Sequence, residues 1–562
     1  MSSLPLSASP VTIPVPPKSV QRASWGWWSQ GERPIVGDEV GIAETIRSVT
    51  TSCVLLDVNG QLAVAQGGTV TFEASAPTKA AYPMLGYVPQ QPPEVLGDAL
   101  FRSDHGLRYA YVAGAMANGI ASTRLVEEMA RAGMLGFFGA AGLSLDRIEA
   151  AIEQISQSVP GLPYGFNLIH SPNEPDLEDA VVALYLKRGI RLVEASAYLR
   201  LTLPVVRYRV SGIRRGVDGR VVTPNRIIAK VSRVEVATQF FSPPPEELLR
   251  ELVRLGEITA EQASLAASIP MAQDVTAEAD SGGHTDNRPL VTLLPSLLAL
   301  RERIQDKYDY AQRLRVGGAG GMSTPSALAA AFAMGAAYVL TGSINQACVE
   351  SGSCDAVRKM LAQAEQADIA MAPAADMFEM GVKVQVLKRG TMFAMRAAKL
   401  FELYRAYSSL EALPPADRNF VEKQLLRTTL EEAWNTTREF FQRRDPKQVV
   451  RAEGDPKHKM ALVFRSYLGL SSRWANAGEA SRAMDYQVWC GPAMGAFNEW
   501  TRGSSLEKPE NRRAVLVAQN LLFGAALRLR IQNLVSQGIR LPDGLSNWHP
   551  LESDAMLKAL NL

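Results

Sequence analysis

The sequence predicts an α/β protein built on a (β/α)8 TIM barrel, with a small N-terminal β-rich domain and a helical C-terminal region. Eight short apolar runs recur between residues 109 and 341, and each is followed by a turn rich in Gly or Ser and an amphipathic helical segment. The runs are continuously apolar, which is typical of parallel strands buried on both faces. An open doubly wound sheet would show the same periodicity, but the count of eight and the residues at the strand ends favour the barrel.

The predicted strands share one pattern, a short buried run that ends at a small or polar residue. They are Tyr109–Val112, Leu135–Phe138, Tyr164–Ile169, Arg191–Ala195, Ile227–Val231, Gln273–Ala277, Leu314–Val316 and Tyr338–Thr341. The helices between them would supply the right-handed crossovers that parallel strands need. We expect the barrel to occupy residues 83–360.

The composition excludes several classes of protein. With 562 residues, of which 47% are hydrophobic and 21% charged, the chain can bury a large core, which excludes disorder as its main state. Lys and Arg number 59 against 57 Asp and Glu, too even a balance for a nucleic-acid-binding surface. Four cysteines without a Cys-x-x-Cys pair indicate a cytoplasmic protein with neither disulfide framework nor metal site.

The N-terminal region is predicted to contain a flexible segment and a small domain. Residues 1–34 are expected to be flexible and lack the features of a signal peptide. Residues 35–82 alternate polar and apolar positions around Asn59-Gly60, a dipeptide that favours a tight hairpin turn, so a β-rich domain is expected there. The proline-rich stretch Pro83–Pro93 predicts a linker.

Residues 361–562 are predicted to be helical. The expected helices, with no strand-like runs between them, are Arg396–Ser408, Asp417–Phe441, Pro492–Thr501 and Arg512–Gln537. Residues Gln442–Met460 carry six Lys or Arg against three acids and are expected to form a solvated loop, with a docking surface for an acidic partner as the alternative. The runs Leu290–Leu300 and Ala327–Leu340 fall short of the roughly 20 residues that cross a bilayer, so no membrane partner is expected.

Glycine-rich segments at three predicted strand ends indicate a nucleotide site. In a barrel a phosphate commonly binds after strands seven and eight, where this chain has Gly320-Gly321 and Gly342-Ser343. The third glycine of a dinucleotide fingerprint is replaced by Ser323, and no Gly-Lys dipeptide forms a P-loop, so one phosphate of a mononucleotide such as FMN is predicted. The small residues Ala113, Gly114, Ala115 and Met116 after the first strand would let a flat ring approach the backbone, although a tight turn alone would also need glycine.

Three polar residues are candidates for the chemistry. Asn167 and Lys230 end predicted strands and could stabilise the anionic N1–C2=O edge of a reduced flavin, although a lone lysine is more often a solvated loop residue. His284 follows Gly282 and Gly283, which would bring its imidazole close to the flat ring, and its ordinary pKa suits proton donation near neutrality. The other histidines, His105, His170, His458 and His549, are expected to be surface or satisfied core residues.

These motifs resemble the FMN-dependent nitronate monooxygenase and enoyl reductase superfamily. More narrowly, Glu278–Pro289 (EADSGGHTDNRP) and Met371–Phe393 resemble the PfaD-type trans-acting enoyl reductases of polyunsaturated-fatty-acid and polyketide synthases. The resemblance implies an FMN barrel that takes hydride from NADPH and reduces a trans-2-enoyl thioester held on an acyl carrier protein. It implies that Ala113–Met116 line the flavin, that Gly320, Gly321, Gly342 and Ser343 hold its phosphate, and that His284 lies over the reacting carbons.

The resemblance leaves three points open. Asp280-Ser281 stands where the broader superfamily tends toward Glu-Ala before Gly-Gly-His, which argues against a nitronate substrate and leaves the carboxylate without a role. The segment Met371–Phe393 is expected either to form a lid over the acyl chain or to join the barrel to the helical region. A nitronate monooxygenase and a non-catalytic scaffold remain alternatives, and a homodimer is compatible with the sequence.

Overall fold

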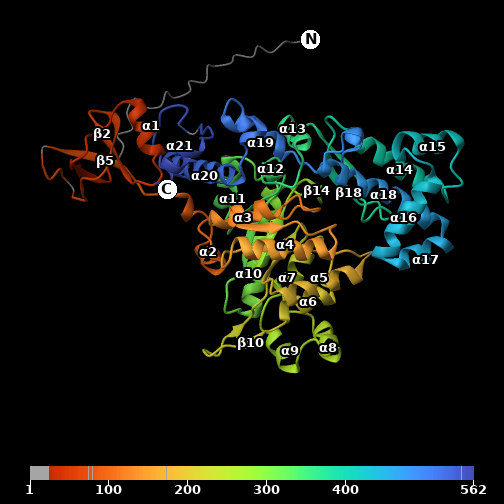
Figure 1. Ribbon diagram of the computed structural model, residues 1–562. Helices are drawn as coiled ribbons and strands as arrows, with labels where there is room; N and C mark the ends of the chain where they lie inside the picture. Colours follow the sequence, from red (N-terminus) through yellow and green to blue (C-terminus); the bar gives the residue numbers. More distant parts are fainter. Residues whose placement is uncertain (1–23, 74, 79, 173, 546, 562) are drawn as a thin grey trace, which may run out of the picture. The chain divides into compact units, whose positions relative to one another are not determined.

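The computed structural model describes residues 24–73, 75–78, 80–172, 174–545 and 547–561. The chain divides into two compact units (Figure 1). The first comprises residues 1–90 and 530–545, and the second comprises residues 91–529 and 546–562. Residues 1–23 of the predicted flexible segment lie outside the described residues.

The first unit is a five-stranded antiparallel sheet with one helix. Its strands follow the order β3-β2-β5-β1-β4, and its elements are β1 (Gly26–Ser29), α1 (Glu39–Arg47), β2 (Cys53–Val58), β3 (Gln61–Ala65), β4 (Thr69–Thr71) and β5 (Ala81–Val88). The predicted hairpin turn is present, because Asn59 and Gly60 adopt φ of 55° and 84° between β2 and β3. Trp28 is fully buried on the core face, and its indole donates a hydrogen bond of 2.8 Å to the carbonyl of Gly67.

The predicted limits of the N-terminal domain were too narrow. Residues 26–29, expected to be flexible, form the strand β1, and the expected linker contains most of β5, which pairs with both β1 and β2. Pro83 occupies β5 opposite Trp27. Pairing of this segment with β1 and β2, which lie earlier in the chain, outweighed the local signal of the prolines.

The second unit contains the predicted barrel, closed in the order β12-β13-β15-β16-β6-β7-β8-β9. The strands are β6 (Tyr111–Ala113), β7 (Leu135–Phe138), β8 (Gly165–Ile169), β9 (Leu192–Ser196), β12 (Arg226–Val231), β13 (Asp274–Glu278), β15 (Arg315–Ala319) and β16 (Val339–Thr341). Every neighbouring pair in the barrel is parallel, which confirms the prediction and excludes the open sheet. The seventh strand is longer than expected, because Gly317 and Gly318 lie inside β15.

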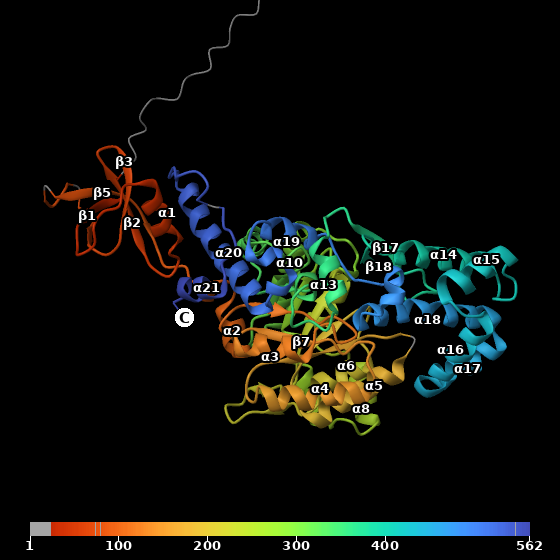
Figure 2. The same cartoon turned by 45° about the horizontal axis from the view of Figure 1, so that its top comes forward.

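Helices surround the barrel in the second unit, as Figure 2 shows. They are α2 (Ala99–His105), α3 (Thr123–Arg131), α4 (Leu145–Ser158), α5 (Pro175–Arg188), α6 (Leu203–Val210), α7 (Val234–Phe241), α8 (Glu246–Arg254), α9 (Ala260–Ala266), α10 (Leu290–Tyr308), α11 (Pro325–Ala333), α12 (Ser343–Gln346) and α13 (Asp355–Ala362). A small hairpin of β10 (Arg214–Arg215) and β11 (Val221–Val222) follows α6.

The region after the barrel is mainly helical, but it also contains strands that the sequence did not predict. A three-stranded antiparallel sheet joins β14 (Gly283–His284) to β18 (Lys383–Leu387) and β17 (Ile369–Pro373). The helices are α14 (Phe393–Ala406), α15 (Pro415–Phe420), the π-helical turn η2 (Val421–Leu426), α16 (Leu430–Arg444), α17 (Pro446–Gly454), α18 (Pro456–Ala477), α19 (Ala493–Thr501), α20 (Ala514–Ser536) and α21 (Ser553–Ala559). In Figures 1 and 2, α14 to α18 gather at one end of this unit.

Two predictions about the helical region were wrong. The single helix expected over Asp417–Phe441 is interrupted at Arg427, which adopts a left-handed φ of 59° before Thr429 caps α16. The expected loop Gln442–Met460 is almost entirely helical, because Asp445 and Asp455 each cap a new helix. Its charge excess is also partly neutralised, since Arg444 and Lys447 pair with Glu174 and Asp176 of the barrel.

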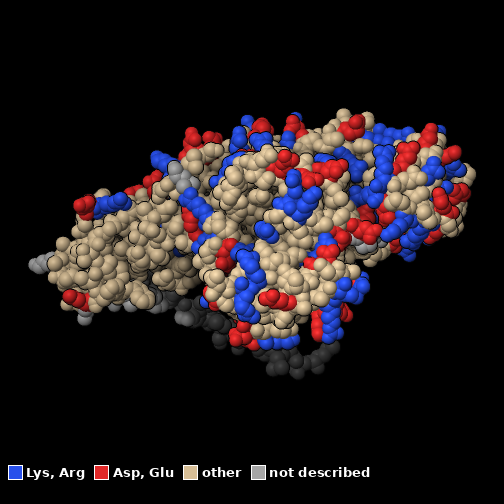
Figure 3. Space-filling view, turned by 60° about the horizontal axis from the view of Figure 1, so that its bottom comes forward, with Lys and Arg blue, Asp and Glu red and all other residues tan. Residues whose placement is uncertain are grey.

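The helix α20 is both long and apolar. By length and composition α20 could cross a membrane, but 78% of its apolar window is buried, as in the core helix of a globular protein. On the face drawn in Figure 3, basic and acidic side chains are interspersed over the second unit, in keeping with the balanced charge of the chain.

Candidate active site

A large pocket lies at the carboxyl end of the barrel strands, within the second unit. Its volume is about 890 Å³, in the range of small-molecule sites. The loops that follow the barrel strands line it on one side, and residues 375–384 with parts of α16 and α18 line the other. The helical region therefore completes a site that the barrel begins.

Among the residues that the structure describes, two loops with unpaired backbone N–H groups line this pocket. Gly320 and Gly321 follow β15, whereas Gly342 and Ser343 follow β16, and all four line the cavity. Within the described residues, no protein acceptor takes the amide hydrogen of any of the four. Unpaired amides that converge on a cavity are the usual cradle of a phosphate group.

Gly320 is required by the geometry of the first loop. Its φ is +84°, and a Cβ atom there would lie 2.6 Å from the backbone carbon of Ala279. Any side chain would push the loop away from the end of β13. At Gly342 a Cβ atom would meet no protein atom within 4 Å, so this position opens onto the cavity.

The small residues after β6 lie where the sequence placed them, with one exception. Gly114, Ala115 and Met116 line the pocket. Ala113 does not, because it is the last residue of β6 and is fully buried between β7 and β16. The backbone amide of Ala115 donates a hydrogen bond of 3.1 Å to the carboxylate of Glu194, which fixes this turn.

Lys230 is held by two carboxylates. Its Nζ lies 3.7 Å from Oε2 of Glu194 and 3.3 Å from Oε1 of Glu278. Burial opposes the charge, but the two carboxylates raise the pKa of Lys230, so the ammonium is retained. Burial also raises the pKa of Glu194, against the attraction of Lys230. The lysine is thus a fixed charge at the pocket wall and not a solvated loop residue.

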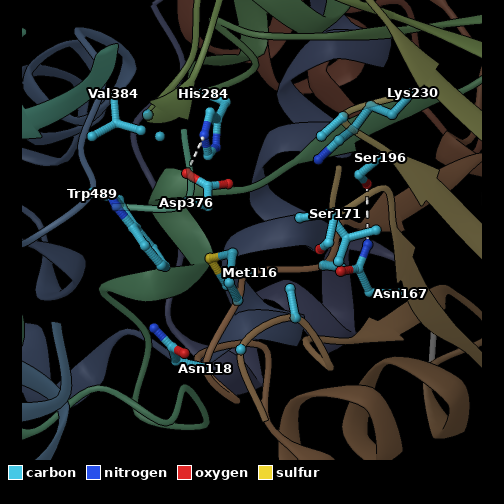
Figure 4. Close-up of a pocket in the computed structure, with 18 of the residues that line it drawn as sticks. Met116, Asn118, Asn167, Ser171, Ser196, Lys230, His284, Asp376, Val384 and Trp489 are labelled. Carbon is cyan, nitrogen blue, oxygen red and sulfur yellow. Dashed lines mark hydrogen bonds and ion pairs between the residues drawn. The ribbon is translucent and has the colours of Figure 1, made fainter. Parts of the chain in front are cut away.

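Asn167 lies in the pocket with its donor groups already committed. Its Nδ2 donates to the backbone carbonyl of Glu194 and to Oγ of Ser196, each at 3.1 Å, as Figure 4 shows for the second bond. The amide nitrogen therefore has no hydrogen left for an anionic ring edge. Its oxygen is the atom that can serve a ligand, as an acceptor for a ring N–H.

His284 forms a hydrogen-bonded pair with Asp376. Its Nε2 lies 3.1 Å from Oδ1 of Asp376, and both side chains line the pocket (Figure 4). Burial lowers the pKa of His284, but the hydrogen bond to Asp376 and its negative charge outweigh this effect and raise it overall. The same contact keeps the pKa of Asp376 below its usual value despite burial. The pair therefore favours an imidazolium beside a carboxylate.

The backbone before His284 is held by a close approach of another segment. A Cβ atom on Gly282 would lie 2.9 Å from the backbone nitrogen of Cys490, so only glycine fits. Asp280 is outside the pocket lining, and its carboxylate accepts hydrogen bonds of 2.8 Å from Asn287 and 3.0 Å from Gln385 on β18. The carboxylate that differs from the superfamily pattern thus fixes the turn that carries His284.

The segment Met371–Phe393 has two roles in the structure. Asp376, Met377 and Met380 line the pocket, so part of the segment is a wall of the site. Phe378 and Phe393 are fully buried in the core of the helical region, and β18 pairs with β14. One part of the segment therefore borders the cavity, and the other part connects it to the core of the helical region.

Several residues that line the site or contact its side chains were not predicted from the sequence. Glu194 and Asp376 contact the predicted site residues directly, whereas Arg473, Gln487 and Trp489 come from the helical region. A charged residue within the buried run of β9 was a usable signal for Glu194. Three of the other histidines have a hydrogen-bond partner: His105 contacts Asp274 at 2.9 Å, His170 contacts Glu178 at 3.1 Å and Nε2 of His458 contacts Gln448 at 2.9 Å. The buried Nδ1 of His458 has no such partner among the described residues. His549 is exposed.

The closed (β/α)8 barrel carries two glycine loops and a histidine at its carboxyl end, the face on which barrel enzymes have their active sites. The chain matches the family model described as nitronate monooxygenase over residues 104–417, more than half of its length, and it belongs to that family of oxidoreductases. A second model, described as the inserted helical domain of an [acyl-carrier-protein] S-malonyltransferase, matches residues 407–486.

Individual relatives narrow the comparison. The chain is 50% identical over 446 residues to a polyunsaturated fatty acid synthase protein of Thraustochytrium, in an alignment that covers 78% of this chain but 30% of that protein. It is 44% identical over 444 residues to the polyketide biosynthesis protein PksE of Bacillus subtilis, covering 78% of this chain and 58% of that protein. The aligned part of the chain thus spans about a third of the length of the Thraustochytrium protein and somewhat over half of the length of PksE.

A solved structure matches a similar share of the chain. The crystal structure of the enoyl reductase domain of MlnA, from the macrolactin biosynthesis cluster of Bacillus amyloliquefaciens, is 39% identical with a TM-score of 0.75. The match covers 79% of this chain and 100% of that domain. The family indicates a flavin as the cofactor, and the residues present fit one, since the glycine loops offer unpaired amides and the cavity is large enough for a tricyclic ring.

Proposed function

We propose that the protein is an FMN- and NADPH-dependent enoyl reductase that acts in trans on trans-2-enoyl thioesters of an acyl carrier protein in polyunsaturated fatty acid or polyketide synthesis. The observation that carries the proposal is the His284–Asp376 pair, which opens on the same cavity as the unpaired amide loops. The names of the synthase relatives and of the MlnA domain support it.

Bound FMN would accept hydride from NADPH and transfer it to the β-carbon of the enoyl thioester. The amides of Gly320, Gly321, Gly342 and Ser343 would hold its phosphate. Lys230, fixed by Glu194 and Glu278, would place a positive charge beside the ring edge where negative charge develops. Asn167 would accept a hydrogen bond from the ring through its amide oxygen.

His284 would supply the proton that the α-carbon needs after hydride addition. Asp376 accepts the hydrogen bond from the imidazole, orients the ring and keeps it protonated. Delivery of a positioned proton is worth roughly 10²–10⁴-fold in rate. A water molecule is the alternative proton donor, and replacement of His284 by Ala distinguishes water from the imidazole.

The acyl chain would occupy the apolar part of the cavity. Met116, Met377 and Trp489 line it, and methionine side chains adapt to chains of different shape. Carrier proteins of the synthase are the proposed partners, in line with the named relatives. The four free cysteines support a reducing location, and we propose the cytoplasm.

The test is an absorbance spectrum followed by an anaerobic titration. Purified protein is expected to show a flavin spectrum that NADPH bleaches and that a crotonyl thioester restores, with one equivalent of thioester reduced per equivalent of NADPH. Failure of the thioester to restore the oxidised spectrum would exclude the enoyl reductase.

A nitronate monooxygenase is the second candidate, favoured by the family model over residues 104–417. It predicts oxygen consumption with alkyl nitronates and no requirement for a nicotinamide. The same preparation, supplied with nitronate in air, distinguishes the two activities. A colourless protein that takes up no flavin would indicate the non-catalytic scaffold.

A further inference from the structure

Arg473 on α18 is a cation at the pocket without a carboxylate partner. Four other pocket-lining cations are paired with carboxylates: Lys230 as described, Arg233 with Asp286, Arg444 with Glu174 and Arg465 with Glu379. Across the described residues no carboxylate lies within 4.0 Å of Arg473 or of Lys383, on β18. Arg473 therefore carries a charge into the site that the protein itself does not balance.

An aromatic ring fixes the guanidinium of Arg473. The guanidinium carbon lies 5.4 Å from the centroid of Phe440, and that of Arg444 lies 5.8 Å from the same ring. The adjacent Ser472 accepts a hydrogen bond of 3.0 Å from Asn118, in the loop after β6. Arg473 therefore lies on a helix that is hydrogen-bonded to the barrel. It lies next to the ring of Phe440, a residue that is 37% exposed.

The charges around Arg473 are mostly of its own sign. Partial burial and the positive charges of Arg444 and Arg147 together lower the pKa of Arg473. Glu174 accepts hydrogen bonds from both Nε and Nη2 of Arg444, and the charge of Asp445 also acts on Arg444. Three guanidinium groups against two carboxylates leave an excess positive charge that an anion would stabilise.

We propose that Arg473, supported by Arg147 and by the ring of Phe440, binds a phosphate group that a substrate carries to the mouth of the pocket. The proposal rests on the proposed function, in which both substrates bear phosphate: the nicotinamide nucleotide on its ribose and the acyl carrier on its phosphopantetheine arm. Guanidinium groups bind phosphate through charge-assisted hydrogen bonds, often bidentate. The site uses residues of α4, α16 and α18, and so differs from the amide loops after β15 and β16.

The test measures ligand binding directly, using the flavin-loaded protein and calorimetry. The probes are 2′,5′-ADP, which carries the phosphate of NADPH, and 4′-phosphopantetheine, with adenosine and pantetheine as their uncharged counterparts. The variants are Arg473→Gln and, as a matched control, Arg443→Gln, which removes an exposed arginine of α16 outside the pocket lining. Arg473→Gln is expected to weaken one phosphate probe about tenfold, whereas the uncharged probes and the Arg443→Gln variant are expected to show no change.

Each outcome decides a separate question. Selective loss of 2′,5′-ADP assigns the site to the nucleotide, and selective loss of 4′-phosphopantetheine assigns it to the carrier arm. Equal affinity of Arg473→Gln and the unmodified protein for both probes, or no binding of either probe to the unmodified protein, overturns the phosphate site. Normal probe binding without thioester reduction would instead overturn the proposed enoyl reductase and leave the phosphate site standing.

Discussion

The imidazole of His284 gains its proposed chemistry from one neighbour. A free histidine titrates near pH 6.5, where half of its population has already lost the proton. The hydrogen bond of 3.1 Å to Asp376 shifts this balance toward the imidazolium. The same carboxylate fixes the orientation of the ring at the pocket wall, so proton supply and position depend on a single contact.

Replacing His284 by Ala is expected to lower kcat for thioester reduction by about 10²–10⁴-fold while the flavin spectrum and flavin affinity stay unchanged. The physical reason is loss of the positioned proton without loss of the amide loops. Stopped-flow measurement of both half-reactions is the check. Flavin reduction by NADPH serves as the internal control, and an unchanged reoxidation rate would assign the proton to water.

Replacing Asp376 by Asn is expected to move the alkaline limb of the kcat profile to lower pH. The pKa of His284 is raised in the folded protein, so turnover is present below that pKa and falls as pH rises through it. Removal of the negative charge lowers the pKa, so the fall begins earlier. A pH profile from 5 to 9 tests this, and Asp306→Asn, which changes an exposed carboxylate outside the pocket lining, is the control. An alkaline limb at the same pH in both variants would contradict the pairing.

At the scale of elements, the site depends on loops whose shape only glycine permits. The turn after β15 lies against the end of β13, and the turn before β14 lies against the backbone of Cys490. The short strand β14 also pairs with β18, so the histidine is fixed by a sheet that includes residues 383–387. Barrel and helical region thus share the elements that hold one side chain.

Replacing Gly320 by Ala is expected to reduce flavin affinity by at least about tenfold, because the added methyl group would lie 2.6 Å from the backbone of Ala279 and would displace the amide from the phosphate cradle. Flavin fluorescence during dilution measures the affinity. The control is Gly321→Ala, which has a similar left-handed φ of +74° but open space around its Cβ position. If both variants lose flavin equally, backbone strain and not the close approach is responsible.

At the scale of the whole molecule, the chain returns late in the sequence to complete its first unit. Arg530 is 1% exposed and donates hydrogen bonds to the backbone carbonyls of Val49, Thr51 and Pro89. Burial of an arginine is unfavourable unless its donors are used, and here Nη1 serves three carbonyls. The first unit is therefore built from segments more than 400 residues apart.

Replacing Arg530 by Ala is expected to destabilise the first unit by about 1–3 kcal/mol, because the buried carbonyl of Val49 and the less buried carbonyls of Thr51 and Pro89 lose their donor. Hydrogen exchange across residues 53–88 is expected to accelerate, while the flavin spectrum stays as in the unmodified protein. Arg528→Ala removes an exposed arginine of the same helix and is the control. Unchanged exchange in Arg530→Ala would contradict the structural role of this side chain.

Much of the barrel and part of the site could be predicted from local sequence. Leu135–Phe138 was predicted with the bounds that β7 adopts, because a fully buried parallel strand has a continuous apolar signature. Twelve of the thirteen predicted site residues line the pocket, since βα loops converge whatever their length, and Ala113 is the exception. The roles proposed for them remain predictions.

The sequence by itself determined the barrel, the glycine loops and the position of His284, because these follow from periodicity and from residues adjacent in the chain. Only the tertiary structure decided which carboxylates complete the site. Glu194 and Glu278 reach Lys230 from two neighbouring strands, and Asp376 reaches His284 across 92 residues. Such pairings depend on distances in space between side chains of distant segments, and no local pattern in the sequence records those distances.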